Sequence, residues 1–237
     1  MNRKDNTKIS SIQRERYHGP LITDGVSLVY IKLYPWIGLV LSGFMYLVGS
    51  YEDNLGIFKG ISLFCGVVNI LGVIISFIPY LVNAWKALIY YLIALTVLSL
   101  VIGLDFIGLL MVISDGSPIG AKEIYQSPLT PFYVILMMFL FIFACGLYAW
   151  YYLPKNQGKV WAFNQVKEGD RKKTWWNNFA TAFAGATIIP SLLTGYIQIA
   201  FGVLLGILLT LTLPAVMVDA FYAAIYIRKH PDSDELV

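Results

Sequence analysis

The sequence is built mainly from long apolar runs separated by short polar segments, and this alternation most constrains its fold. A bilayer core of about 30 Å is crossed by roughly 20 helical residues at about 1.5 Å each. Only 13% of the residues are charged, compared with about 25% in soluble proteins. The sequence therefore predicts an all-α polytopic membrane protein. Its six transmembrane helices are expected at residues 28–50, 55–82, 87–113, 132–153, 177–197 and 199–227.

A strongly basic segment between the fourth and fifth apolar runs gives the expected orientation. Residues 154–176 hold six cations and two acids, and basic loops remain on the cytoplasmic side of a membrane. Alternation of the spans then places both the N- and C-termini in the cytoplasm. In this arrangement 15 of the 17 lysines and arginines lie inside, and only Lys59 and Lys122 lie outside.

The predicted organisation has five parts, all belonging to a multi-pass protein of the cell membrane. The polar first 25 residues lack the apolar core of a signal peptide, so the first run is expected to remain as a span. The parts are a cytoplasmic N-terminal tail (1–27), a four-helix membrane segment (28–153), a basic cytoplasmic loop (154–176), a two-helix membrane segment (177–227) and a cytoplasmic C-terminal tail (228–237).

Two carboxylates, Asp105 and Asp219, stand inside apolar runs. A charge at the middle of a bilayer costs about 3 kcal/mol on insertion scales. Each carboxylate is therefore expected to face the bundle interior, a water-filled cavity or a partner subunit. One interpretation is a proton or substrate site, and the other is a structural carboxylate bonded to a neighbouring hydroxyl, amide or cation. Their expected depths differ by roughly 5–10 Å, which argues against a catalytic pair.

The surroundings of Asp219 suggest possible partners. Arg228 follows nine residues later and therefore lies about 180° around the helix, on the opposite face. The expected partners are instead Thr187 or Thr194 in the fifth span, water, or another subunit. The sequence predicts that Asp219→Asn preserves the fold and impairs function. Pro214 can kink the helix, either for packing alone or to free carbonyls for a cation.

Two further polar residues, Asn69 and Gln198, complete the set of intramembrane candidates. Small residues spaced four apart, as in Gly202-x-x-x-Gly206 and Gly56-x-x-x-Gly60, let helix backbones approach each other. Packing within this chain is the expected use of both motifs.

Several catalytic signatures do not occur in the sequence. Both histidines, His18 and His230, lie outside the expected spans, so no transmembrane haem ligand is predicted. No zinc-protease motif and no nucleotide-binding lysine loop is present. The two cysteines, Cys65 and Cys145, are expected to be small core residues. No catalytic residue, metal site or cofactor is predicted.

These observations leave three functional hypotheses open. The first is a permease-like or accessory transmembrane subunit of a multi-component transporter. The second is an interaction or immunity-type protein that scaffolds or shields another membrane complex, and the third is an intramembrane lipid-modifying enzyme. A protein partner is expected, but nucleic acid is not, because the net charge is only +3. Anionic lipid headgroups or an acidic partner surface are expected at four loop cations: Lys167, Arg171, Lys172 and Lys173.

Overall fold

A computed structural model describes residues 26–50, 56–113, 121–153, 156 and 197–229, and every regular element within them is helical. Four of these helices are long and apolar enough to cross a membrane. The all-helical class predicted from the sequence is thus confirmed, and four apolar helices fit a membrane-embedded protein. The elements are η1 (Leu28–Lys32), α2 (Tyr34–Val48), α3 (Ile57–Ser76), α4 (Pro79–Ala84), α5 (Lys86–Ile113), α6 (Ala121–Gln126), α7 (Leu129–Tyr151) and α10 (Ile197–Lys229).

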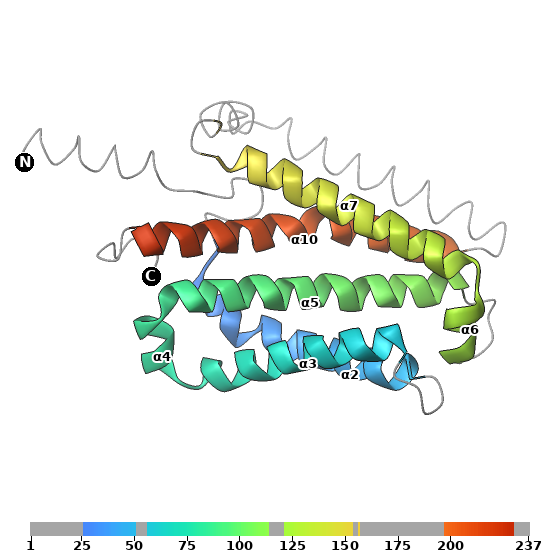
Figure 1. Cartoon of the computed structure of the whole chain (residues 1–237), viewed down its shortest axis with the longest axis horizontal. Helices are drawn as coiled ribbons and strands as arrows, with labels where there is room; N and C mark the ends of the chain where they lie inside the picture. The colour runs from blue at the N-terminus through green and yellow to red at the C-terminus, as the bar shows by residue number, and fades with distance from the viewer. Residues whose placement is uncertain (1–25, 51–55, 114–120, 154–155, 157–196, 230–237) are drawn as a thin grey trace, which may run out of the picture.

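Helix α5 is the centre of the described bundle. Figure 1 shows α2 and α3 on one side of α5, with α7 and α10 on the other. In the most apolar 18-residue stretch of α5, 61% of the residues are buried, whereas in that of α7 only 17% are buried. A helix that is apolar on all faces is expected in an interior, and α5 has this composition. Helix α7, in contrast, presents most of its apolar surface outward.

The first expected span, 28–50, is not one continuous α-helix. A short 3-10 helix, η1, comes first, and the Ser27 hydroxyl caps it by accepting the backbone N–H of Val29 at 3.2 Å. Helix α2 then begins with Pro35 in its first turn. Proline has no N–H to continue a preceding helix but fits a first turn. The 15 residues of α2 extend only about 22 Å at 1.5 Å per residue.

The second expected span, 55–82, is also interrupted. Helix α3 ends at Ser76, and α4 starts again at Pro79. Between them Ile78 has φ −114° and ψ 80°, which agrees with the steric exclusion of helical geometry before proline.

The third, fourth and sixth expected spans correspond to α5, α7 and α10, and α3 within the second is also long and apolar enough to cross a membrane. The fifth, apart from Ile197, falls outside the described residues, as do most of the basic loop, apart from Asn156, and most of both tails, of which only 26–27 and 228–229 are described. Six spans and cytoplasmic termini therefore remain predictions.

Glycines bring α5 and α10 into close contact. A Cβ atom on Gly202 would lie 2.7 Å from the carbonyl oxygen of Gly108 and 2.6 Å from Cβ of Met111. Packing within the chain is therefore confirmed for Gly202. For Gly60 it is not, because a Cβ there would meet nothing within 4 Å among the placed atoms.

Candidate functional site

Asp105 lies near the middle of α5 and joins three helices. Its two carboxylate oxygens accept the hydroxyl of Thr210 on α10 at 2.8 and 2.9 Å. The same hydroxyl oxygen lies 3.7 Å from the sulfur of Met137 on α7. A hydroxyl has one hydrogen to donate, so the two oxygens share it. The carboxylate keeps further capacity to accept hydrogen bonds.

Thr210 lies where α10 lacks one of its backbone hydrogen bonds. It stands four residues before Pro214, which lies inside the helix. Proline cannot donate to the carbonyl four residues earlier, so the Thr210 carbonyl loses its usual helical donor. The sequence had connected Pro214 with Asp219; through Thr210, the structure connects it with Asp105.

Tyr133 on α7 supplies a second polar group at this point. Its side chain is buried, and its hydroxyl has no hydrogen-bond partner among the described residues. The phenol oxygen sits where Cβ atoms on Gly108 and Gly206 would otherwise lie. The two glycines therefore create a niche for the phenol, and Gly108 is less than one helical turn from Asp105. An unused donor and a partly used acceptor thus lie close together on α7 and α5.

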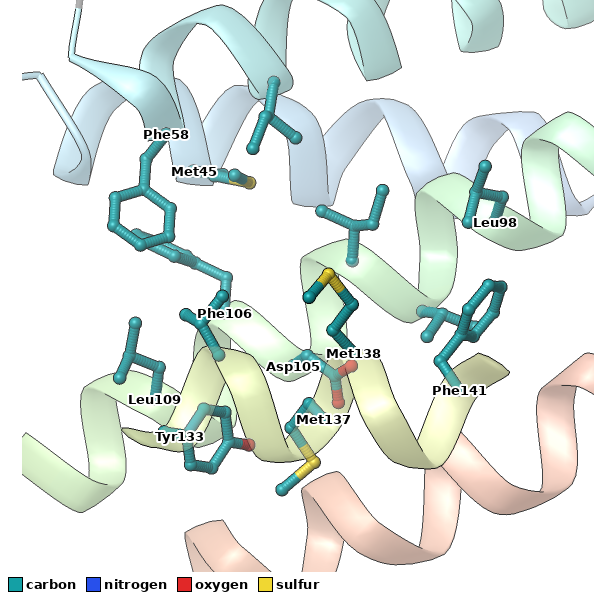
Figure 2. A pocket seen from close by; sticks show the side chains of 14 residues that line it. Met45, Phe58, Leu98, Asp105, Phe106, Leu109, Tyr133, Met137, Met138 and Phe141 are labelled. Atoms are coloured by element: carbon teal, nitrogen blue, oxygen red, sulfur yellow. The ribbon is translucent and has the colours of Figure 1, made fainter. Parts of the chain in front are cut away.

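Asp105 and Tyr133 lie on the wall of a cavity of about 220 Å³. Figure 2 shows their side chains with the methionines and phenylalanines of the lining, and α2, α3, α5 and α7 all contribute to it. Among the lining side chains that the structure describes, Asp105 is the single charged one. An apolar cavity of about 150 Å³ holds one benzene molecule, whereas drug-sized ligands need roughly 300 Å³ or more. The cavity therefore has room for a small, mainly apolar group.

Asp219 has a different environment, at the end of the bundle where α5 begins. The side chain is 4% exposed, and its carboxylate accepts the backbone N–H of Val26 at 2.6 Å. Tyr90 on α5 donates its hydroxyl to the carbonyl of the same Val26 at 3.2 Å. The chain entering η1 is thus held between α5 and α10. Asp105 and Asp219 belong to separate sites.

One partner of Asp219, the backbone N–H of Val26, was not among those expected from the sequence. Thr187 and Thr194 lie outside the described residues, and the observed donor is a backbone group 193 residues away along the chain. Reasoning from side-chain types overlooked it because every residue except proline carries the same N–H group.

Asn69 also joins three helices, but only through hydrogen bonds that support packing. Its buried amide nitrogen donates to Ser99 at 2.6 Å, to the Cys65 carbonyl at 2.8 Å and to Ser42 at 3.2 Å. These bonds connect α3 with α5 and α2. Cys65 is buried and Cys145 is half-buried, and both are free thiols.

The remaining sequence candidates are not placed by the structure. Gln198 lies in the first turn of α10, but its side chain is outside the described residues. The same holds for the four loop cations Lys167, Arg171, Lys172 and Lys173. Where side chains are described, no three His, Cys, Asp or Glu residues gather as metal ligands.

Sequence reasoning did not identify Thr210 and Tyr133. For Thr210 a signal existed, since it stands four residues before an intrahelical proline. Tyr133 is one of 16 tyrosines, and nothing in its local sequence distinguishes it.

Comparison with known proteins does not assign the chain to a family. No protein-family model, no curated protein and no solved structure matches it. A functional proposal must therefore depend on the geometry of the chain itself.

Proposed function

We propose that the chain is a permease-like or accessory transmembrane subunit of a multi-component transporter in the cell membrane. The observation that supports this proposal is the Asp105 carboxylate, held by one shared hydroxyl beside an apolar cavity. A carboxylate inside a membrane helix costs about 3 kcal/mol to insert, and such residues typically mark substrate or proton pathways. An apolar residue would fill this position at lower cost.

In this proposal Asp105 exchanges its hydrogen-bond partner during the working cycle. Its spare lone pairs accept a proton or a polar group of the substrate, and the Tyr133 hydroxyl donates to the same species. Thr210 belongs to α10, so release of its hydroxyl loosens the contact between α5 and α10. The missing hydrogen bond at Pro214 gives α10 a point at which to bend.

A second candidate is an interaction protein that scaffolds or shields another membrane complex. It is favoured by α7, because only 17% of the residues in its most apolar stretch are buried. The outward face of α7 can pack against a partner's helices as well as against lipid.

One purification separates the two candidates. The tagged full chain is isolated from its native membrane in mild detergent, and its partners are identified by mass spectrometry. Co-purification of an ATPase supports the transporter subunit, whereas co-purification of a complex without transport components supports the interaction protein. A monodisperse protein that retains no partner and turns over lipid would contradict both.

The same complex tests the role of Asp105. After reconstitution, Asp105→Asn should leave the complex intact and reduce substrate-stimulated ATP hydrolysis at least about tenfold. Loss of a proton transfer that limits the rate typically costs about a hundredfold or more, so tenfold is the smallest effect that the proposal accepts. Glu123→Gln, an exposed carboxylate on α6, is the matched control and should have no effect. Equal stimulation in all three proteins would contradict the proposed role.

A further inference from the structure

A hollow lined by both polar and apolar side chains lies at the end of the bundle where α5 begins and α10 ends. Its volume is about 650 Å³. Asn83 and Trp85 line it at the corner between α4 and α5, Lys86 and Tyr91 line it on α5, and Arg228 lines it on α10. Figure 1 shows that these helix ends lie together, although they are far apart in the sequence.

The hollow brings together two cations that have no acidic partner among the described residues. Lys86 and Arg228 both line it, and neither forms an ion pair within the described part of the chain. Three acids occur in the described ranges. Asp219 accepts the N–H of Val26, Asp105 lies near the middle of α5, and Glu123 is on α6 at the opposite end of the bundle (Figure 1). Among the described residues, the hollow is therefore a site of net positive charge.

An apolar strip continues from the hollow along α5 and α10. Leu88 is 50% exposed, and Leu95 and Phe221 are each 37% exposed. The ring of Tyr91 contacts that of Phe221 edge-on, with centroids 5.6 Å apart. Residues 88, 91 and 95 share one face of a helix by their spacing. Cations, then amphipathic rings, then apolar side chains thus follow one another along the surface.

This order matches the chemistry of an anionic lipid. Lysine and arginine pair with phosphate oxygens, tryptophan and tyrosine favour the headgroup layer, and the apolar strip suits an acyl chain. Basic pockets between membrane helices are known to take anionic headgroups. We infer that this hollow binds the phosphate-bearing headgroup of an anionic membrane lipid between Lys86 and Arg228. The inference does not depend on the proposed transport function, nor on the basic loop.

Native mass spectrometry of the full chain tests the inference directly. The protein is purified from nanodiscs of phosphatidylcholine mixed with phosphatidylglycerol, and retained lipids are counted. Wild-type protein should retain phosphatidylglycerol in preference. The double variant Lys86→Gln/Arg228→Gln should lower its affinity about 30-fold, which corresponds to about 1 kcal/mol for each cation.

The matched control is Lys59→Gln/Lys122→Gln, which removes two cations from the opposite end of the chain's described part. It should leave retention unchanged. Equal loss in both double variants would overturn the inference, since it would indicate attraction by overall charge. Absence of any preference in wild-type protein would overturn it even if the glutamine variant did not fold.

A third arm distinguishes a lipid from a free phosphate. Inorganic phosphate and glycerol phosphate are added at increasing concentration to lipid-loaded protein. Retention of phosphatidylglycerol should persist, because the acyl chain contributes to binding. Complete displacement by inorganic phosphate alone would assign the hollow to a soluble anion and overturn the lipid assignment.

Discussion

Asp105 and Asp219 are both carboxylates in membrane helices, but they differ in what they hold. Asp219 accepts a backbone N–H at 2.6 Å from Val26, whose carbonyl is bonded in turn by Tyr90. Asp105 accepts one shared hydroxyl and lies on the wall of a cavity. Asp219 fixes a chain segment. Asp105 instead joins two helices through the side chain of Thr210, which can also form other hydrogen bonds.

The difference follows from the donors. Val26 is only 4% exposed, and a buried backbone N–H must find an acceptor. A threonine hydroxyl can instead bond a carbonyl in the preceding turn of its own helix. Removing Asp219 therefore leaves a donor without a partner, whereas removing Asp105 does not. This comparison favours a structural role for Asp219, unlike the sequence-based prediction, and a functional role for Asp105.

The largest expected effect is all-or-none and concerns which membrane face each carboxylate approaches. Cysteines introduced at Asn54 or Ser117, outside the described residues, should react with an impermeant reagent from outside the cell. Cysteines between 155 and 173 should react only after permeabilisation. Asp219 would then lie toward the cytoplasmic face. The reverse labelling pattern would invert the orientation of both sites.

Replacing Asp219 should produce the largest change in stability. Asp219→Leu leaves the Val26 N–H without its acceptor and should cost about 3 kcal/mol of unfolding free energy. Asp219→Asn retains an oxygen that can accept this bond, so it should cost much less. Unfolding in mixed micelles measures both. If the leucine variant is as stable as the asparagine variant, the structural role of Asp219 is wrong.

The helix crossing beside Asp105 should be nearly as sensitive. Gly202→Val places a Cβ atom against the Gly108 carbonyl and should cost about 2 kcal/mol through overpacking. Gly60→Val is the control, since its Cβ would meet no neighbour. The same unfolding assay applies. Equal stability of the two variants would show that α5 and α10 do not approach at Gly202.

Asp105 should contribute less to stability than Asp219. Asp105→Asn and Thr210→Val should each cost about 1 kcal/mol, with a coupling of about 0.5–1.5 kcal/mol between them in a double-mutant cycle. The coupling would arise from the hydrogen bond of 2.8 Å that connects the two side chains. A coupling of zero would separate the two residues and remove the basis of this comparison.

The smallest effect is expected at Tyr133. Its hydroxyl lacks a partner in the described residues, so Tyr133→Phe should change stability by less than about 0.5 kcal/mol or raise it slightly. A marked loss of stability would reveal an interaction of this hydroxyl that the described residues do not contain. Loss of transport at unchanged stability would instead support the donor role proposed for it.

The sequence by itself determined the class of the protein and the extent of its main helices. In hydrocarbon the backbone must satisfy its hydrogen bonds within each segment, so a sufficiently long apolar run predicts a helix without reference to its neighbours. Helices α5, α7 and α10 follow this rule closely. The interruptions at Pro35 and Pro79 were not predicted, although proline acts on its own segment and the signal was present in the sequence.

The pairing of side chains was decided only by the tertiary structure. Which residues meet depends on how each helix is rotated about its axis, and an amphipathic pattern normally reveals this. Helices α5 and α10 are apolar on nearly all faces, so their sequences carry no such pattern. Glycine contacts and side-chain packing set the rotation instead. They bring Thr210 to Asp105 and Arg228 near Lys86, and they place Asp219 against the backbone of Val26.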